Sequence, residues 1–441
     1  MSTTVRRAFK KFAPDLVGYS KVSFFKDLSA GITVGIVSLP LSLALAIATG
    51  VPPIVGLYTA GIAGTIASVF SGSRFSVSGP AAAMVPVLAA IIGQFGTDKL
   101  LMITVIAAAF LLLFGIIGLG KLIVKIPESI VLGFTAGVAV VIIAGQLNAF
   151  FGLSGITPHD HFLASFIETL THAGTAHLPT IMVGLLALAT IIWGNKITYL
   201  RKIPSTLMAV TLATVLVQFL PLFDGVATLA EAYGAIMVGL PSFSLAMPSF
   251  SPDYIFPAFK IAMLIAIETL LCAMVADRLT RTRHNPSQEL ISQGIGNLSS
   301  ALFGGIPSTA VIARTGTAVK SGAVSRLTGI IHGLTIIAFL AVLAPLANAI
   351  PLAALSAILI ITAARISEYK EVMQAIKRHA FDFDITLVTT LVLTVMTDLT
   401  IGVGVGIFMY LLRRKVFNRA IEGRRTLIKA MKDDVEGFSK D

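Results

Sequence analysis

Long apolar segments, separated by short polar connections, recur from residue 28 to residue 412. A helix that crosses a bilayer needs about 20 mostly apolar residues, and several segments are shorter, so the pattern predicts about twelve to fourteen spans. It predicts an all-α polytopic membrane protein. The apolar segments cover residues 28–49, 53–72, 80–95, 99–119, 129–150, 180–194, 203–220, 256–276, 290–303, 325–346, 350–364, 384–397 and 400–412.

Two interruptions of this apolar pattern stand out, because non-helical backbone at membrane depth is tolerated only inside protein or beside a water-filled cavity. The first, Ser71–Ser78, is short and polar and leads into Gly79-Pro80, where we expect Pro80 to take the first position of a helix. The second, Gly304–Thr317, contains glycines, a proline and an arginine. Interrupted segments indicate a transporter's binding site. We therefore predict two half-helices, each preceded by a short extended piece.

The two interruptions also indicate an internal repeat. Phe70-Ser-Gly precedes the first and Phe303-Gly-Gly precedes the second. The acidic loop 221–255 separates two halves of about seven spans, and an odd number of spans inverts the second half relative to the first. The predicted parts are a basic cytoplasmic N-terminus (1–26), a first inverted repeat (27–220), the extracytoplasmic loop (221–255), a second inverted repeat (256–412) and a short cytoplasmic tail (413–441).

Composition supports a membrane location, since 56% of the 441 residues are apolar and 12% are charged, against about 25% charged in soluble domains. The net charge of +11 lies in alternate connections, whereas loops 151–178 and 221–255 contain no Lys or Arg. This is the positive-inside pattern, which predicts cytoplasmic termini, and it argues against a nucleic-acid partner.

Arg314 is the leading candidate for holding a substrate. It lies beside Thr315 at the start of the second predicted half-helix, and Ser78, Gly79 and Pro80 start the first. Each helix N-terminus acts as about half a positive charge, so two of them and Arg314 total about +2, which favours an anion and especially a dianion. One alternative makes Arg314 a structural partner of Glu268, and another makes Pro80 an ordinary helix kink.

Glu268 lies in the middle of an apolar span, where an ionisable group indicates function. An ionised Glu268 near the anion would repel it, whereas desolvation favours the neutral carboxyl. We therefore predict that Glu268 carries the coupled proton of a proton–anion symporter. The alternative is a carboxyl permanently hydrogen-bonded between helices.

Other chemical signals are weak. His159 and His161 lack a nearby third ligand, so no metal site is predicted, and no cofactor-binding or catalytic motif indicates an enzyme. Gly402–Gly406 is better explained by helix packing than by dinucleotide binding. His332 is interpreted as a packed, hydrogen-bonded residue of an apolar span.

Several stretches resemble the SulP sulfate permease family. Within it, Glu268–Cys272 and Ala310–Thr315 resemble the bacterial branch that transports C4-dicarboxylates. The stretches that carry the family resemblance are Pro40 with Gly50–Tyr58, Gly72–Pro80, Ala276-Asp-Arg, Glu289–Asn297 and Phe303-Gly-Gly.

The resemblance implies fourteen segments in two inverted repeats of seven, divided into core and gate domains that move as an elevator in a homodimer of the bacterial inner membrane. It makes Glu268 the proton-coupling residue, and Cys272, where sodium-coupled members have a hydroxyl, counts against sodium. The substrate is expected between two helix starts and beside the first segment, at Ser78, Gly79, Pro80, Ala81, Ala313, Arg314, Thr315, Leu41 and Leu45.

The sequence departs from the family in two ways. Leu41 and Leu45 stand where many animal members have polar or aromatic residues, which leaves the identity of the anion open. The 29 residues after Leu412 are too few for the regulatory STAS domain that members usually carry, so this domain is expected to be absent.

The expected function is secondary active transport of a small anion, with proton-coupled symport of sulfate or a C4-dicarboxylate as the leading hypothesis. The alternatives are bicarbonate or chloride transport or exchange, nucleobase–proton symport, and an anion channel or membrane motor. Nucleobase symporters of this architecture use a carboxylate at the second half-helix, where this chain has Arg314.

Overall fold

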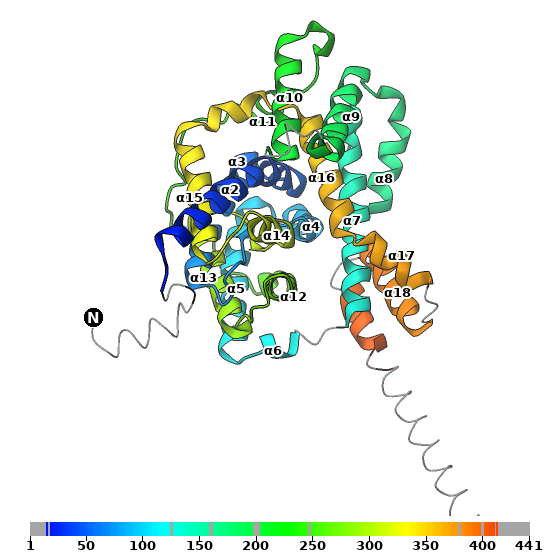
Figure 1. Ribbon diagram of the computed structural model, residues 1–441. Helices are drawn as coiled ribbons and strands as arrows, with labels where there is room; N and C mark the ends of the chain where they lie inside the picture. The colour runs from blue at the N-terminus through cyan, green and yellow to red at the C-terminus, as the bar shows by residue number, and fades with distance from the viewer. Residues whose placement is uncertain are drawn as a thin grey trace, which may run out of the picture. The chain divides into compact units, whose positions relative to one another are not determined.

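The structure is a computed structural model that describes residues 15, 18–123, 127–157, 162–196, 203–245, 248–377, 381–397, 401–410 and 412. The predicted cytoplasmic tail (413–441) and the His159/His161 pair lie outside these residues. The chain forms two compact units, which are described separately (Figure 1). Unit 1 comprises Met1–Lys125 and Val138–Ile366, and unit 2 comprises Ile126–Gly137 and Ser367–Asp441.

Every predicted apolar segment falls on a helix. Unit 1 contains α2 (Lys21–Thr49), α3 (Pro53–Phe70), α4 (Val85–Phe95), α5 (Thr97–Ile116), α6 (Gly120–Ile123), α8 (Phe162–Thr171), α9 (Leu178–Trp193), α10 (Ser205–Phe219), α11 (Leu229–Tyr233), α12 (Ile255–Thr280), α13 (Pro286–Leu302), α14 (Ile312–Lys320), α15 (Leu327–Val342) and α16 (Leu352–Ile366). Helix α7 (Glu128–Phe151) contributes to both units, and unit 2 adds α17 (Tyr369–Lys377), α18 (Phe381–Met396) and a helix at Ile401–Tyr410.

Six helical stretches of the described chain are long and apolar enough to cross a membrane. Seven shorter apolar helices accompany them, including α9, α10 and α15. The mostly helical, polytopic character predicted from the pattern is therefore confirmed. The six stretches are Lys21–Thr49, Pro53–Phe70, Thr97–Ile116, Ser129–Phe151, Pro252–Thr280 and Leu352–Gln374.

A two-stranded sheet joins distant parts of unit 1. Strand β1 (Ser78–Gly79) pairs antiparallel with β2 (Thr309–Ala310), with Ser78 opposite Ala310 and Gly79 opposite Thr309. The amide of Val311 donates to the carbonyl of Val77 at 3.1 Å and extends the pairing. The predicted short strands before the two helix starts are confirmed.

The prediction that Pro80 begins a helix is wrong. Ala81 has extended backbone angles, and the helical region starts with the 3-10 turn η2 (Ala82–Met84), which continues into α4. The chain stays extended through Ala81 because β1 pairs with β2 and because the carbonyl of Pro80 accepts a hydrogen bond from Arg314.

The connection 151–178, expected to be a loop, contains helix α8. Its ten residues are too few to resemble a span, and the apolar side chains Leu163, Ile167 and Leu170 remain exposed. The hydroxyl of Thr169 donates to Asn148 of α7 at 2.9 Å, which ties the helix to its neighbour. A short helix of this kind has no long apolar run by which it could be predicted.

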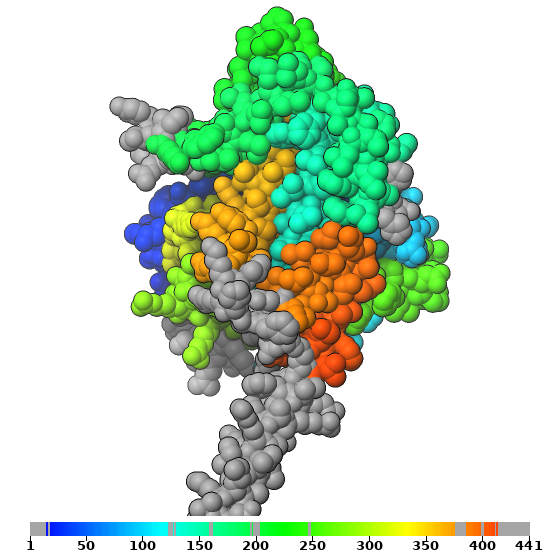
Figure 2. Space-filling view, turned by 90° about the vertical axis from the view of Figure 1, so that its right-hand side faces the viewer, coloured from blue at the N-terminus to red at the C-terminus, as the bar shows by residue number. Residues whose placement is uncertain are grey.

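Small residues let the helices of unit 1 approach closely. A Cβ atom on Gly31 or Gly35 of α2 would lie 2.6 Å from Ile331 or 2.7 Å from Thr335 of α15, so these glycines permit the contact. On the face shown in Figure 2, α16 (gold) borders the green surface of α9 and α10, with which it packs.

Glycines also pack the helices of unit 2. A Cβ atom on Gly402 would lie 2.5 Å from the hydroxyl of Thr394, and one on Gly406 would lie 2.4 Å from the hydroxyl of Thr390, both on α18. The packing interpretation of Gly402–Gly406 is confirmed.

Candidate functional site

Arg314 lies in the first turn of α14, and only 2% of its surface is exposed. Helix α14 packs against α2 and α12 and lies between them in Figure 1. A guanidinium group buried among membrane helices is costly unless protein dipoles or an opposite charge compensate it. The surroundings of this group therefore define the candidate site.

Three hydrogen bonds hold the guanidinium group. Nε donates to the Ser38 hydroxyl at 3.1 Å, Nη2 donates to the Ser42 hydroxyl at 3.0 Å, and Nη1 donates to the Pro80 carbonyl at 2.9 Å. Guanidinium has five N–H groups, so these contacts leave one on Nη1 and one on Nη2 for another acceptor. Two such N–H groups suit the fork-like recognition of a carboxylate or another oxyanion.

Ser38 and Ser42 share one face of α2 with Leu41 and Leu45, because the four residues follow the spacing i, i+3, i+4 and i+7. All four are buried. Leu41 and Leu45, predicted from the family resemblance, therefore lie on the face that contacts Arg314. The two serines were missed, although hydroxyls four residues apart in an apolar span would have indicated them.

Gly79 allows the guanidinium group to lie against the strand. A Cβ atom at this position would lie 2.4 Å from Nη1 of Arg314 and 3.0 Å from its Cζ. Only glycine leaves this space open without moving the arginine.

We expect Gly79→Ala to displace the guanidinium group while preserving the fold, because the atom in its way belongs to the end of a flexible side chain. Breaking the bond from Nη1 to the Pro80 carbonyl should weaken anion binding about tenfold. Calorimetric titration with sulfate and succinate, beside a melting curve, measures both effects. Gly145→Ala is the control, since a Cβ atom on Gly145 meets nothing within 4 Å. Unchanged affinity in Gly79→Ala would contradict this account of the glycine.

The hydroxyls of Ser78 and Thr315 support the strand pair. The side-chain amide of Gln293 donates to Ser78 at 2.8 Å. Thr315 accepts from the Val77 amide at 3.1 Å and from the Cys272 thiol at 3.2 Å. These predicted site residues therefore stabilise the framework around Arg314.

The remaining predicted residues differ in exposure. Ala81, which precedes η2, is 3% exposed, whereas Ala313, which precedes Arg314, is classed as exposed. The start of α14 is thus accessible from one side while its arginine is enclosed.

Glu268 lies on α12, one helical turn before Cys272, which contacts Thr315 of α14. It therefore occupies the face of α12 that packs against α14. Its Oε2 atom is buried without a hydrogen-bond partner among the described residues, and these residues show no ion pair within 4.0 Å between Glu268 and Arg314. The two groups therefore form no contact ion pair, although each interacts electrostatically with the other.

Glu289 is a supporting residue that the sequence analysis named only as the start of a stretch shared with the family. Its buried Oε2 atom accepts from the Ser71 hydroxyl at 2.8 Å, from the Gly72 amide at 2.7 Å and from the Ser73 amide at 2.9 Å. These bonds fix the turn that leads into β1. A carboxylate in the first turn of α13 was the available signal.

The long apolar helices are those of a multi-pass membrane protein. Residues 24–389 match the family model described as Sulfate permease family. The chain therefore belongs to the sulfate permease family, a family of membrane anion transporters.

Among the described residues, no group of three or more His, Cys, Asp or Glu side chains could hold a metal ion.

Two similar bacterial proteins extend this comparison of sequences. The chain is 40% identical over 412 residues to the candidate sulfate transporter YvdB of Bacillus subtilis, covering 92% of this chain and 76% of YvdB. It is 32% identical over 404 residues to the bicarbonate transporter BicA of Picosynechococcus, covering 87% of this chain and 69% of BicA.

Solved structures share the fold. The transmembrane domain of a cyanobacterial bicarbonate transporter BicA matches with a TM-score of 0.77 and 27% identity, covering 87% of this chain and 98% of that domain. The murine anion transporter Slc26a9 matches with a TM-score of 0.81 and 18% identity, covering 95% of this chain and 73% of its own.

Proposed function

We propose that this protein is a secondary active transporter that binds a small anion at Arg314. The observation that carries the proposal is the enclosed guanidinium group, which is held by Ser38, Ser42 and Pro80 and keeps one N–H on each terminal nitrogen. The starts of η2 and α14 add helix-terminal N–H groups nearby. A positive group aligned in this way binds a carboxylate or oxyanion through two hydrogen bonds.

The proposed substrates are sulfate and C4-dicarboxylates. Both are dianions, and they match the positive charge of Arg314 and two helix starts. The similarity to YvdB favours sulfate. Bicarbonate is a second candidate, favoured by the similarity to BicA in sequence and structure. Arg314 itself argues against a nucleobase, because a neutral base would leave its buried charge uncompensated.

The proposed coupling ion is the proton, carried by Glu268. The support is its position on the α12 face toward α14 and its buried oxygen without a partner. A carboxyl that shares an enclosed space with an incoming anion is favoured in its neutral form. Proton and anion therefore enter together. Cys272 makes a sodium site less suitable, since a thiol is a poor ligand for a hard cation.

The proposed architecture is two inverted repeats of seven segments, with core and gate domains and an elevator motion. The pairing of β1 with β2 supports it, because it joins the two predicted repeats beside Arg314. The proposed protein is a homodimer of the bacterial inner membrane with cytoplasmic termini. The absence of Lys and Arg from loops 151–178 and 221–255 supports that orientation.

The test is uptake into vesicles that contain the purified protein and carry an imposed pH gradient. Labelled sulfate, succinate, bicarbonate and chloride are supplied outside, with an acidic exterior or with no gradient. A proton-coupled transporter concentrates its anion only with the gradient. Flux that follows the anion's electrochemical gradient without concentration would indicate a channel, and flux that requires an internal anion would indicate an exchanger.

A further inference from the structure

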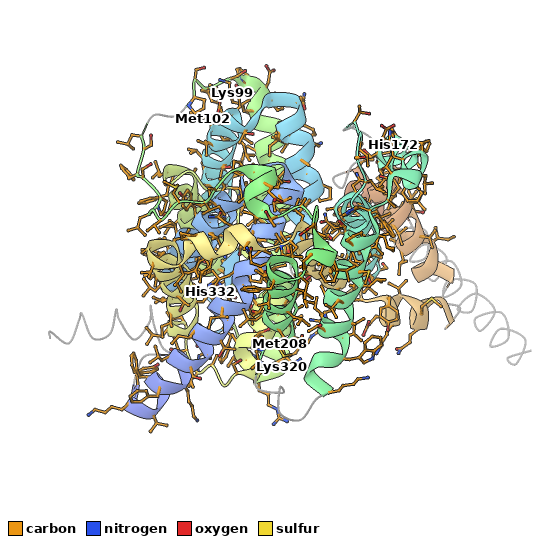
Figure 3. The ribbon with its side chains drawn as sticks, turned by 90° about the horizontal axis from the view of Figure 1, so that it is seen from above. Lys99, Met102, His172, Met208, Lys320 and His332 are labelled. Carbon is orange, nitrogen blue, oxygen red and sulfur yellow. The ribbon has the colours of Figure 1, made fainter. Side chains whose placement is uncertain are left out.

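His332, on α15, is completely buried and lies outside the set of residues proposed above. Its Nε2 atom lies 3.1 Å from the hydroxyl oxygen of Ser38, the same oxygen that accepts from Nε of Arg314. Figure 3 shows His332 in the interior of unit 1, beside α2, whereas His172 lies at the periphery. A buried histidine is thus linked to Arg314 by two hydrogen bonds through one shared hydroxyl group.

His332 lies where α15 packs closely against α2 and α3. Gly35 of α2 faces Thr335 of α15, where an added Cβ atom would lie 2.7 Å away. On the other side, a Cβ atom on Gly64 of α3 would lie 3.4 Å from Cε1 and Nδ1 of the imidazole. Gly64 therefore leaves room for the imidazole ring between α15 and α3.

A buried carboxylate also fastens the start of α15 to α2. Asp27 accepts from the amides of Val324 and Ser325 and from the hydroxyl of Thr328, at 2.7, 3.1 and 2.7 Å. Tyr19 donates its hydroxyl to the same carboxylate, and burial together with this bond raises the pKa of Tyr19, so the hydroxyl keeps its proton. These bonds keep α15 and α2 in register.

The chemistry of the three groups sets the direction of the chain. Nε of Arg314 can only donate, so the Ser38 oxygen accepts from it. The same hydroxyl then either donates its hydrogen to Nε2 of His332 or accepts a second bond from Nε2–H. In both cases His332 restrains the hydroxyl group that orients the arginine. The ring's Nδ1 atom has no partner among the described residues, so Ser38 is the side chain that uses this histidine.

We propose that His332 is a positioning residue for anion binding, which acts through the Ser38 hydroxyl to hold the Arg314 guanidinium group in its binding orientation. The inference rests on the proposed function, because it assigns a role relative to the anion site at Arg314. It explains why a polar ring occupies a fully buried position in an apolar helix, where an aliphatic side chain would pack without an unpaired nitrogen.

The test compares His332→Gln with His332→Asn in the purified full-length protein, titrated calorimetrically with sulfate and with succinate. The glutamine amide reaches about as far as Nε2 and can bond to Ser38, whereas the asparagine amide reaches only as far as Nδ1. We expect His332→Gln to bind within about twofold of the wild type and His332→Asn to bind about tenfold more weakly. The melting temperatures of the two variants should be similar, since both bury one amide.

A double-mutant cycle uses Ser38→Ala, His332→Leu and the variant that carries both changes. If His332 acts through Ser38, the variant with both changes binds the anion no more weakly than Ser38→Ala alone. His172→Gln, a histidine change at the periphery, is the control and should bind as the wild type does. Equal affinities for the glutamine and asparagine variants, or additive losses in the double variant, would overturn the proposal.

Arg314→Gln in the same titrations separates this inference from the proposed function. If Arg314→Gln retains wild-type affinity, the anion site itself has been assigned wrongly. If Arg314→Gln loses binding while His332→Asn matches the wild type, the anion site stands and only the positioning role fails.

Discussion

Arg314→Gln is expected to weaken anion binding by at least about 100-fold, which corresponds to about 2.7 kcal/mol. Glutamine removes the positive charge. It also removes the three hydrogen bonds that the guanidinium group donates to Ser38, Ser42 and the Pro80 carbonyl. Calorimetric titration and initial uptake rates into vesicles measure the loss. Arg365→Gln, at an exposed arginine in the last turn of α16, is the matched control and should leave both quantities unchanged.

Arg314→Lys refines the same prediction. Lysine keeps the positive charge but carries its three N–H donors on one nitrogen. It therefore cannot donate to two serines, a carbonyl and both oxygens of an anion at the same time. Its affinity is expected between those of the wild type and Arg314→Gln. Full affinity in the glutamine variant would contradict a charge-based site, and full affinity in the lysine variant would contradict a role for the fork.

Glu268→Gln is expected to abolish stimulation of uptake by an inward proton gradient while preserving anion binding. Glutamine resembles the protonated carboxyl in shape and charge but cannot release a proton. The variant should therefore still exchange internal for external anion and should show no accumulation driven by pH. Both quantities are measured in vesicles, with labelled anion inside for exchange and an acidic exterior for accumulation.

The matched control for Glu268→Gln is Glu371→Gln, because Glu371 is an exposed carboxylate on α17. Its pH-driven accumulation should equal that of the wild type. Accumulation of wild-type size in Glu268→Gln would remove Glu268 from the coupling mechanism. Loss of exchange as well as accumulation would instead assign the carboxyl to anion binding or to the fold.

Much of the fold could be predicted from the local pattern of apolar residues. A chain that crosses a membrane must pair its backbone polar groups internally, so each long apolar run predicts a helix. The helix starts after β1 and β2 were also predictable, since Gly79-Pro80 and Gly304–Thr317 interrupt such runs. Arg314 could be predicted to lie near the helix start that follows Gly79-Pro80, because each of them belongs to an interruption of the apolar pattern. The exact start at Ala82 could not, since the pairing of β1 with β2 and the bond from Arg314 to Pro80 are tertiary contacts.

The side chains that hold Arg314 were harder to predict. Ser38 and Ser42 belong to a segment more than 270 residues away, and serine is common in membrane helices as a packing residue. Only the register of α2 against α14 decides that these hydroxyls, as well as Leu41 and Leu45, face the arginine. His332 was interpreted as a packed, hydrogen-bonded residue, which is correct, but its partner depends on the close contact of α15 with α2.

The most direct test of the anion site is to locate the bound anion itself, with selenate as a heavy-atom substitute for sulfate and its anomalous scattering as the readout. The account predicts a selenium peak beside Nη1 and Nη2 of Arg314, near the starts of η2 and α14, and no peak there in Arg314→Gln. A peak elsewhere in the protein, or one that persists at this position in the glutamine variant, would contradict it.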